Sequence, residues 1–153
     1  MSAITERPQT ILIVEDNDDD FECTYDALCE SGNLRNPIHR ASTGQGALDY
    51  LLHQGDFSDK FAHPRPGLIL LDLNLPGING KSILKVVRDS DTLKHIPVIV
   101  FTTSNDPMDI HQCYALGANS YIQKPTTLDK LVNSIQAVKN YWFEITMLPM
   151  HTD

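Results

Sequence analysis

Short runs of consecutive apolar residues constrain the fold of this chain more than any other feature of its sequence. The strong runs are ILIV at 11–14, LILL at 68–71 and VIVF at 98–101, and weaker candidates are PIHR at 37–40 and YI at 121–122. The strong runs do not alternate polar with apolar residues, which is typical of parallel strands covered on both faces. They recur at intervals of roughly 30 residues, about the length of one strand–helix unit.

The segments between these runs carry helical patterns. Helices are expected at 18–30, within 43–55, at 81–88, at 107–116 and along the apolar stripe at 128–138. Five strand–helix repeats predict a doubly wound α/β domain, in which a five-stranded parallel sheet carries helices on both faces. Ligands of such domains bind at the carboxyl ends of the strands.

The chain divides into one folded unit and two terminal segments. We assign residues 1–9 to an N-terminal extension, 10–141 to the domain and 142–153 to an apolar C-terminal arm. The segment 54–67 is polar and rich in proline and glycine, which predicts a surface loop before the third strand.

The net charge of −8 bears on partners rather than on the fold. It argues against a nucleic-acid-binding surface, which would need a basic face, and it fits binding of cations or of a basic partner. The three cysteines are odd in number and lack metal-ligand spacing, so reduced thiols are expected. The sequence shows no apolar run of membrane-spanning length and no signal-peptide pattern, so we expect a cytoplasmic protein without membrane partners.

Charged and hydroxyl side chains follow the ends of the predicted strands. Glu15 and Asp16 follow the first strand, Asp72 the third, Thr102 the fourth and Lys124 the fifth. These side chains should converge, because the carboxyl ends of parallel strands meet at one edge of the sheet. Clustered carboxylates repel one another unless a cation compensates, and hard oxygen ligands favour Mg²⁺. Asp72 would then be a nucleophile toward phosphorus, with Lys124 and Thr102 contacting the phosphoryl oxygens.

The acidic run at 16–20 also invites comparison with a calcium-binding loop. Its D-x-D-x-D spacing matches the first three ligand positions, but Phe21 stands where glycine is needed and Ala27 where glutamate is needed. A calcium loop is therefore excluded. The aspartates at 18–20 are instead expected to start a helix, where negative charge complements the helix dipole.

Four motifs, in their order and spacing, carry a resemblance to a known family. They are ED at 15–16, LLDLNLPGING at 70–80, FTTS at 101–104 and YIQKP at 121–125. Over roughly residues 10–141 the chain resembles the receiver domain of response regulators in two-component signalling. The resemblance implies a flavodoxin-like sheet with strand order 2-1-3-4-5 and a single-domain response regulator.

The resemblance implies that Asp72 accepts a phosphoryl group from a phosphohistidine on a histidine kinase. Asp16, Asp72 and the backbone carbonyl of Asn74 would bind Mg²⁺ directly. Glu15 would act through a coordinated water. The signal would leave by protein–protein contact with an unidentified downstream protein or by onward phosphotransfer. Catalysis would be limited to the chain's own phosphorylation and dephosphorylation.

The resemblance also implies a switch. Thr102 would move to hydrogen-bond the phosphoryl group, and Tyr121 would swing inward behind it. Lys124 would form an ion pair with the phosphoaspartate. The Lys124–Pro125 bond is one that is often cis in this family, which would aim the lysine.

A narrower resemblance concerns the kinase partner. The DLNLP motif at 72–76, the long loop before it and the aromatic YWFEITMLP segment at 141–149 resemble response regulators that serve phytochrome-type histidine kinases. This resemblance implies a photoreceptor kinase as the phosphoryl donor.

The C-terminal arm is more apolar than a free chain end, which is normally polar. It either folds back on its own domain or covers a second subunit. We expect a symmetric homodimer through the last helix and the arm, with contacts from Trp142, Phe143, Ile145 and Leu148.

Two other functions stay open. A Mg²⁺-dependent phosphatase of the haloacid-dehalogenase type also forms an aspartyl phosphate, but its D-x-D motif needs an acid where this chain has Asn74. The second is a receiver-like module that only binds partners. Turnover of a generic phosphomonoester would favour the phosphatase, whereas single-turnover labelling would favour the receiver.

Overall fold

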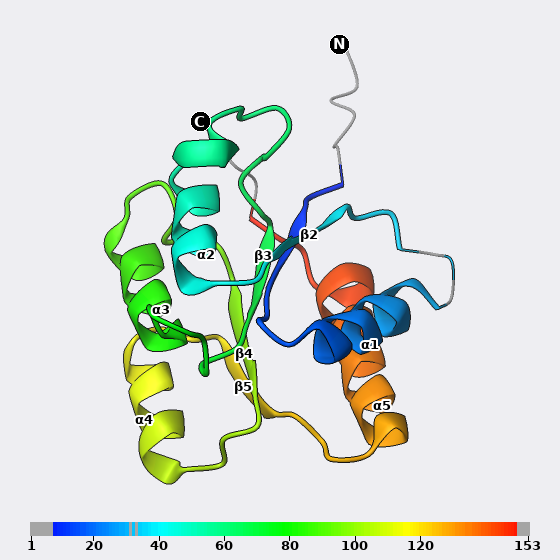
Figure 1. The fold of residues 1–153 in the computed structure, drawn as a ribbon. Coiled ribbons are helices and arrows are strands. Elements are labelled where there is room, and N and C mark those ends of the chain that lie inside the picture. The colour runs from blue at the N-terminus through cyan, green and yellow to red at the C-terminus, as the bar shows by residue number, and fades with distance from the viewer. Residues whose placement is uncertain (1–7, 31, 33, 150–153) are drawn as a thin grey trace.

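A parallel sheet forms the centre of the computed structural model, which describes residues 8–149 apart from 31 and 33 (Figure 1). Its order is β2-β1-β3-β4-β5, and every neighbouring pair is parallel. The strands are β1 Ile11–Val14, β2 Ile38–Ala41, β3 Leu68–Leu71, β4 Val98–Thr102 and β5 Ser120–Gln123. The predicted fold and strand order are confirmed, including the two weaker strand candidates.

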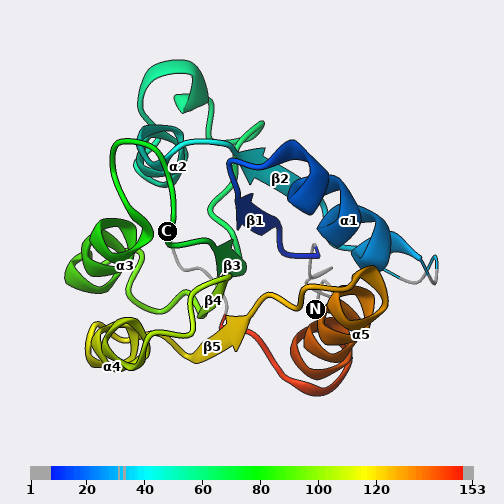
Figure 2. The same cartoon turned by 60° about the horizontal axis from the view of Figure 1, so that its bottom comes forward.

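The helices lie in two layers, one on each face of the sheet. They are α1 Asp18–Cys29, α2 Gly44–Leu51, α3 Gly80–Asp89, α4 Pro107–Ala115 and α5 Leu128–Lys139. Figure 2 shows α1 and α5 on one face and α2, α3 and α4 on the other. The helix expected within 43–55 ends at Leu51, because His53 takes a positive φ of 54° and a short 3-10 helix follows at Gly55–Phe57.

The core explains why the strong strands read as continuous apolar runs. In β1, Leu12 and Val14 pack into the cluster beneath α2, α3 and α4, whereas Ile11 and Ile13 pack into the cluster beneath α1 and α5. Successive side chains of a strand point to opposite faces, so a strand covered on both faces needs apolar residues at every position. These four β1 side chains are at most 2% exposed.

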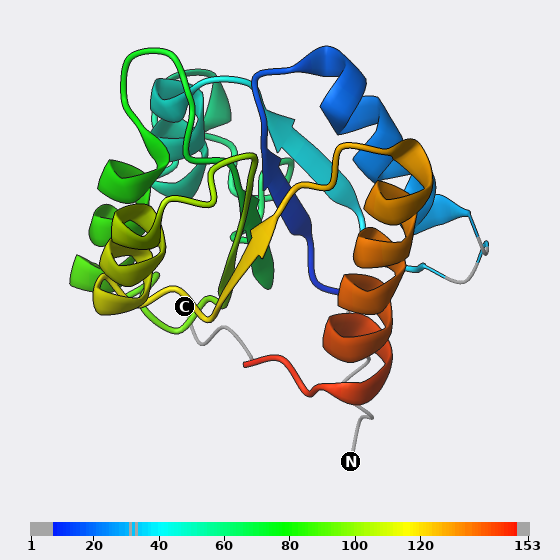
Figure 3. The same cartoon turned by 90° about the horizontal axis from the view of Figure 1, so that it is seen from below.

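The strand register brings the carboxyl ends of the strands to one edge. Val14 pairs with Ala41 on one side and with Leu71 on the other, Leu71 pairs with Val100, and Val100 pairs with Tyr121. Figure 3 views the molecule from this edge. The residues that follow these positions therefore emerge side by side.

The C-terminal arm continues the last helix and then folds back. A π-helix, η2, runs over Asn140–Ile145, and three side chains beyond α5 pack against the core cluster beneath α1 and α5: Trp142, Phe143 and Leu148. Gln9 donates a side-chain hydrogen bond to the Pro149 carbonyl at 2.8 Å. Of the predicted terminal segments, residues 1–7 and 150–153 lie outside the described residues.

Arg88 of α3 ties together segments at the opposite, amino-terminal edge of β4 and β5. Its guanidinium donates to the carbonyls of Gly117 at 2.8 Å, Lys94 at 3.0 Å and Ile96 at 2.8 Å, and to the Asn119 side chain at 2.8 Å. Gly117 has a φ of +97°, and a Cβ there would lie 2.7 Å from Arg88 Nε. Arg88 therefore connects α3, the start of β4 and the turn before β5.

We expect Arg88→Met to lower the free energy of unfolding by about 2–4 kcal/mol, because it removes the donor of two part-buried hydrogen bonds, to the Gly117 and Ile96 carbonyls, and two exposed ones. Urea denaturation followed by circular dichroism measures this loss. The control is Lys85→Met on the same helix, whose ion pair with Asp89 has both side chains about two-thirds exposed. Equal stabilities of the two variants would contradict the role given to Arg88.

Candidate functional site

Three carboxylates meet at the carboxyl edge of the sheet. Glu15, Asp16 and Asp72 each offer an oxygen, and these oxygens lie within 4.8 Å of one another. Glu15 and Asp72 are buried, at 4% and 6% exposure, whereas Asp16 is exposed. The backbone N–H groups of Glu15 and Asp72 continue the strand ladder, each donating to a neighbouring strand at 3.0 Å. The sheet therefore fixes the predicted acidic cluster.

Lys124 lies among these carboxylates and is 5% exposed. Its Nζ donates to Glu15 Oε1, to Asp20 Oδ2 at 3.0 Å and to Asp72 Oδ2 at 3.2 Å. Burial opposes the charged form of the ammonium, but the bonds and charges of Glu15, Asp72 and Asp20 outweigh burial and raise the pKa of Lys124. The ammonium therefore stays protonated and partly neutralises the cluster.

Glu15 shows that one ammonium does not fully compensate these acids. Burial foremost raises the pKa of Glu15 to about 7, against the opposing effect of Lys124 and with a further contribution from Asp72. Among the described residues, Lys124 is the cation paired with the Glu15 carboxylate, and Asp20 and Asp72 share it, so the buried Glu15 carboxylate is held at a cost in free energy. The donor set of hard oxygens and its excess negative charge fit a divalent metal ion.

Two close glycine contacts fix the loop that follows β3. A Cβ on Gly80 would lie 2.4 Å from the Asp72 carbonyl oxygen, and one on Gly44 would lie 2.1 Å from the Ile78 carbonyl oxygen. Within the loop, the Asn74 N–H donates to Asp72 Oδ1 at 3.2 Å. The loop is therefore pressed between α2 and the end of β3, which orients the Asp72 carboxylate.

Thr102 and Tyr121 lie on the side of β4 and β5. Thr102 is fully buried, and its hydroxyl has no hydrogen-bond partner among the described residues. A buried hydroxyl without a partner is rare, and it leaves a donor available to a ligand oxygen. Tyr121 is half-buried against the core, and its hydroxyl donates to the Ser104 carbonyl at 2.9 Å.

Three details differ from the sequence-based expectations or were missed by them. The Lys124–Pro125 bond is trans, and the Lys124 backbone is placed instead by its N–H, which donates to the Thr102 carbonyl at 2.6 Å. Asp20 does more than start a helix, because it reaches Lys124. Arg40 was not predicted at all.

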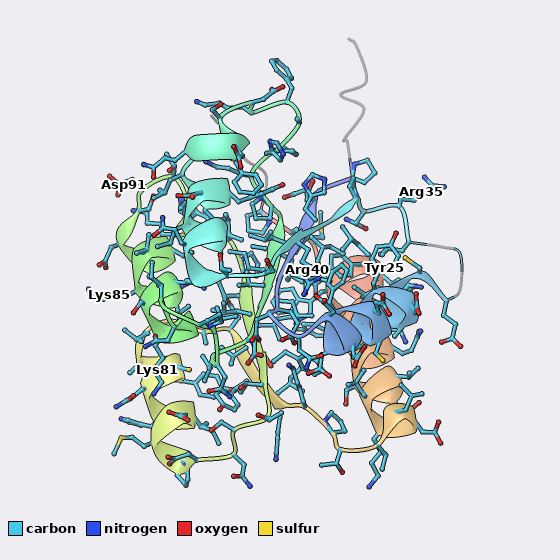
Figure 4. All side chains as sticks on the ribbon, in the orientation of Figure 1. Tyr25, Arg35, Arg40, Lys81, Lys85 and Asp91 are labelled. Carbon is cyan, nitrogen blue, oxygen red and sulfur yellow. The ribbon has the colours of Figure 1, made fainter. Side chains whose placement is uncertain are left out.

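Arg40 of β2 supports the Glu15 end of the site. Its Nε donates to the Glu15 carbonyl at 3.1 Å, its Nη2 lies 2.7 Å from Asp18, and its guanidinium carbon lies 4.6 Å from the centre of the Phe21 ring. Figure 4 labels Arg40 beside α1. The spacing of Asp16 and Asp20 would have indicated a second acid facing the site. Nothing in the sequence pairs Arg40 with Asp18 or with the Glu15 carbonyl.

Residues 11–136 match the model of the response regulator receiver domain family. The chain belongs to this family. Receivers are response regulators of two-component systems rather than an enzyme family, and they are typically phosphorylated and bind a divalent metal. Within the described part of this receiver, every helix is too short or too polar to span a bilayer.

The similar proteins include regulators named for phytochrome. Response regulator Rcp1 of Synechocystis sp. is 34% identical over 97% of this chain and 99% of its own length. The Mn²⁺-bound crystal structure of Rcp1 has a TM-score of 0.87 at 34% identity, covering 94% of this chain and 100% of that one. The crystal structure of the phosphorylated cyanobacterial phytochrome response regulator RcpA has a TM-score of 0.88 at 34% identity, covering 94% of this chain and 99% of that one. The structure of the bacteriophytochrome response regulator RtBRR has a TM-score of 0.72 at 38% identity, covering 93% of this chain and 84% of that one.

We expect Asp16→Asn to raise the metal-free stability of this receiver by about 1 kcal/mol, because it removes one charge from mutually repelling carboxylates. The same change should abolish most of the stabilisation that added Mg²⁺ gives the wild type, since metal that binds only the native state raises the unfolding temperature. Thermal denaturation with chelator and with Mg²⁺ measures both effects.

The control is Asp19→Asn, which changes an exposed acid of α1 outside the cluster. It should leave the metal-induced shift unchanged. An Asp16→Asn protein that is less stable without metal, or equally stabilised by Mg²⁺, would contradict the cluster described here.

Proposed function

We propose that Asp72 accepts a phosphoryl group from the phosphohistidine of a histidine kinase, and that the modified chain signals through protein–protein contact or onward phosphotransfer. One observation carries the proposal. The buried Asp72 carboxylate lies 3.2 Å from the Lys124 ammonium, and the neighbouring strand β4 ends in a buried Thr102 hydroxyl that has no partner among the described residues. Such a set can receive the oxygens of a phosphoryl group.

The transfer is a displacement at phosphorus. An Asp72 oxygen forms the new P–O bond while the P–N bond to the kinase imidazole breaks and its electron pair returns to the ring nitrogen. Asn74 N–H and Lys124 orient the carboxylate before the transfer, with contacts at 3.2 Å each. Afterwards Lys124 pairs with the phosphoaspartate.

The same residues would hold the metal. Asp16, Asp72 and the Asn74 carbonyl would be direct ligands of Mg²⁺, with Glu15 acting through water. When bound, Mg²⁺ neutralises charge on the phosphoryl group during transfer. The exposure of Asp16 and Asn74 keeps this side of the site open to solvent and to the kinase.

The switch would use Thr102 and Tyr121. The Thr102 hydroxyl donates to a phosphoryl oxygen, which gives the buried group the partner it lacks. Tyr121 then holds the inward position in which its hydroxyl reaches Ser104. The charge of the added phosphoryl group would thereby bias the conformation of the loop between β4 and α4, as in other phosphorylation switches.

We further propose a cytoplasmic protein, with Mg²⁺ as the resident metal and a phytochrome-type kinase as the donor. The pathway is supported by RcpA and RtBRR, which are named as phytochrome and bacteriophytochrome regulators and resemble this chain over more than nine-tenths of its length. Catalysis by the chain would be limited to its own phosphorylation and dephosphorylation.

Incubation with acetyl phosphate and Mg²⁺ should add one phosphoryl group to the wild-type chain, as measured by intact mass. Asp72→Asn should carry no adduct, and chelation of the metal should prevent labelling of the wild type. Asp91→Asn, which changes an acid that is 97% exposed after α3, serves as the matched control and should label normally.

The two rival functions give different results. Repeated turnover of a phosphomonoester would indicate a phosphatase of the haloacid-dehalogenase type. Absence of an adduct, under conditions in which another receiver is labelled, would indicate a module that only binds partners.

We also propose a symmetric homodimer through α5 and the arm. Of the four predicted contact residues, Ile145 is 72% exposed, whereas Trp142, Phe143 and Leu148 pack partly against their own core. Tyr141 and Trp142 line a groove of about 610 Å³ with α5 and the edge strand β5. An apolar groove beside exposed apolar side chains of the same arm favours a second copy as its occupant.

Ile145→Asp should halve the solution mass measured by light scattering, because it places a charge in the dimer contact. Phosphorylation by acetyl phosphate should be unchanged. Phe61→Asp is the control, since Phe61 is an apolar side chain that is 94% exposed and belongs to the loop 54–67, not to the arm. A wild-type protein that is monomeric well above micromolar concentration would contradict the dimer.

A further inference from the structure

A polar network outside the acidic cluster joins α3 to α4. Lys81 Nζ of α3 donates to Asp109 Oδ1 at 2.5 Å and to Gln112 Oε1 at 2.6 Å, both on α4. The other oxygen of Asp109 accepts from the Ser104 hydroxyl at 2.6 Å. Figure 4 labels Lys81 where α3 adjoins α4. One carboxylate thus connects two helices and the loop before α4.

Ser104 belongs to this network and to the switch at the same time. Its hydroxyl bonds to Asp109 and also accepts from the Asp106 N–H at 3.3 Å, while its carbonyl accepts from the Tyr121 hydroxyl at 2.9 Å. Ser104 also lies two residues beyond Thr102. The position of its carbonyl therefore depends on what holds its side chain.

We propose that Lys81 and Asp109 are positioning residues for the phosphorylation switch, because they hold Ser104 where its carbonyl receives the Tyr121 hydroxyl. This inference rests on the proposed phosphoacceptor function. It assigns a role to two residues outside the phosphorylation site, neither of which lies in the metal cluster or contacts Asp72 in the structure.

The ion pair between Lys81 and Asp109 is more fixed in position than an ordinary surface ion pair. Lys81 and Asp109 side chains are each only 28% exposed, whereas an exposed pair contributes little. Hydrogen bonds from Lys81 and from Ser104 lower the pKa of Asp109, so its carboxylate is stabilised in the charged form that accepts both bonds. Asp109 also lies in the first turn of α4, where negative charge is favourable.

Loss of the ion pair would release the switch through Ser104. Without Lys81, the Asp109 carboxylate is free to turn to solvent, and the Ser104 hydroxyl loses its acceptor. The loop then has other conformations available, and Tyr121 loses the carbonyl that holds it inward. The inward state becomes less populated, so the conformation that favours phosphorylation is reached less often.

The test compares Lys81→Met and Asp109→Ala with Lys81→Arg and Lys85→Met. Arginine can replace the ion pair with Asp109. Lys85 is an ion-paired lysine one turn along the same helix, 2.8 Å from Asp89, and within the described residues no hydrogen bond or ion pair joins its side chain to the loop before α4. The first readout is the NMR ring resonance of Tyr121 in unphosphorylated protein, identified by its loss in Tyr121→Phe. The second is the initial rate of labelling by acetyl phosphate with Mg²⁺.

Lys81→Met and Asp109→Ala should move the Tyr121 resonance toward the position of a solvent-exposed tyrosine. They should slow labelling about three- to tenfold, as expected for residues that alter a coupled equilibrium. The labelling rate of Lys81→Arg should stay within about twofold of the wild-type rate, and the labelling rate of Lys85→Met should equal the wild-type rate. Lys81→Met/Asp109→Ala should be no slower than Asp109→Ala alone, because both changes act through one carboxylate.

An unchanged Tyr121 resonance in Lys81→Met and Asp109→Ala would overturn the inference, as would equal effects of Lys81→Met and Lys85→Met. Failure of the proposed function gives a different result, since the wild type itself would then not be labelled. In that case the Tyr121 resonance still decides whether Lys81 and Asp109 position the loop, because that readout needs no phosphoryl group.

Discussion

The ion pairs of the buried Lys124 ammonium with Glu15 and Asp72 hold the carboxyl edge of the sheet together. Lys124 follows β5, which lies two strands from β3, so its side chain must pass over the end of β4. Adjacent strands are about 4.8 Å apart, so β3 and β5 are separated by two such spacings, and an extended lysine side chain covers most of the distance between them. The short Thr102 side chain at the end of β4 leaves room for the lysine to pass, and its own hydroxyl is fully buried.

Much of the site was predictable because its residues directly follow buried strands. Once ILIV, LILL and VIVF are taken as parallel strands, Glu15, Asp72 and Thr102 must emerge at one edge whatever the loops do. Prediction was weaker where helix rotation decides the contact. Asp20 reaches Lys124 only because Asn17 caps α1 and so sets the rotation of its first turn. A sequence pattern gives the face of a helix but not the partner that this face meets.

The fate of the arm depended on competition between two apolar surfaces. Composition identified the arm as apolar but could not distinguish its own core from a second subunit, since both bury the same kind of surface. Trp142 and Phe143 lie against the core while Tyr141 and Ile145 stay exposed, so the chain's own core buries only part of the arm. The network around Asp109 was equally hidden, because Lys81 and Asp109 are far apart in sequence and belong to unremarkable helical patterns.

Charge would also connect metal binding to phosphorylation in the proposed site. Lys124 contacts three carboxylates, and Asp16 adds a fourth acid to the cluster, so without metal the edge is net negative. A phosphoryl donor is itself an anion and is repelled by such an edge. A divalent cation among these oxygens would remove that repulsion, whereas replacing an acid with a neutral residue would also remove a ligand. In the function proposed here, the excess of acid over base would make the metal-free site a poor phosphoryl acceptor, and the cost of burying Glu15 beside Asp72 would be retained because the same oxygens would hold the metal.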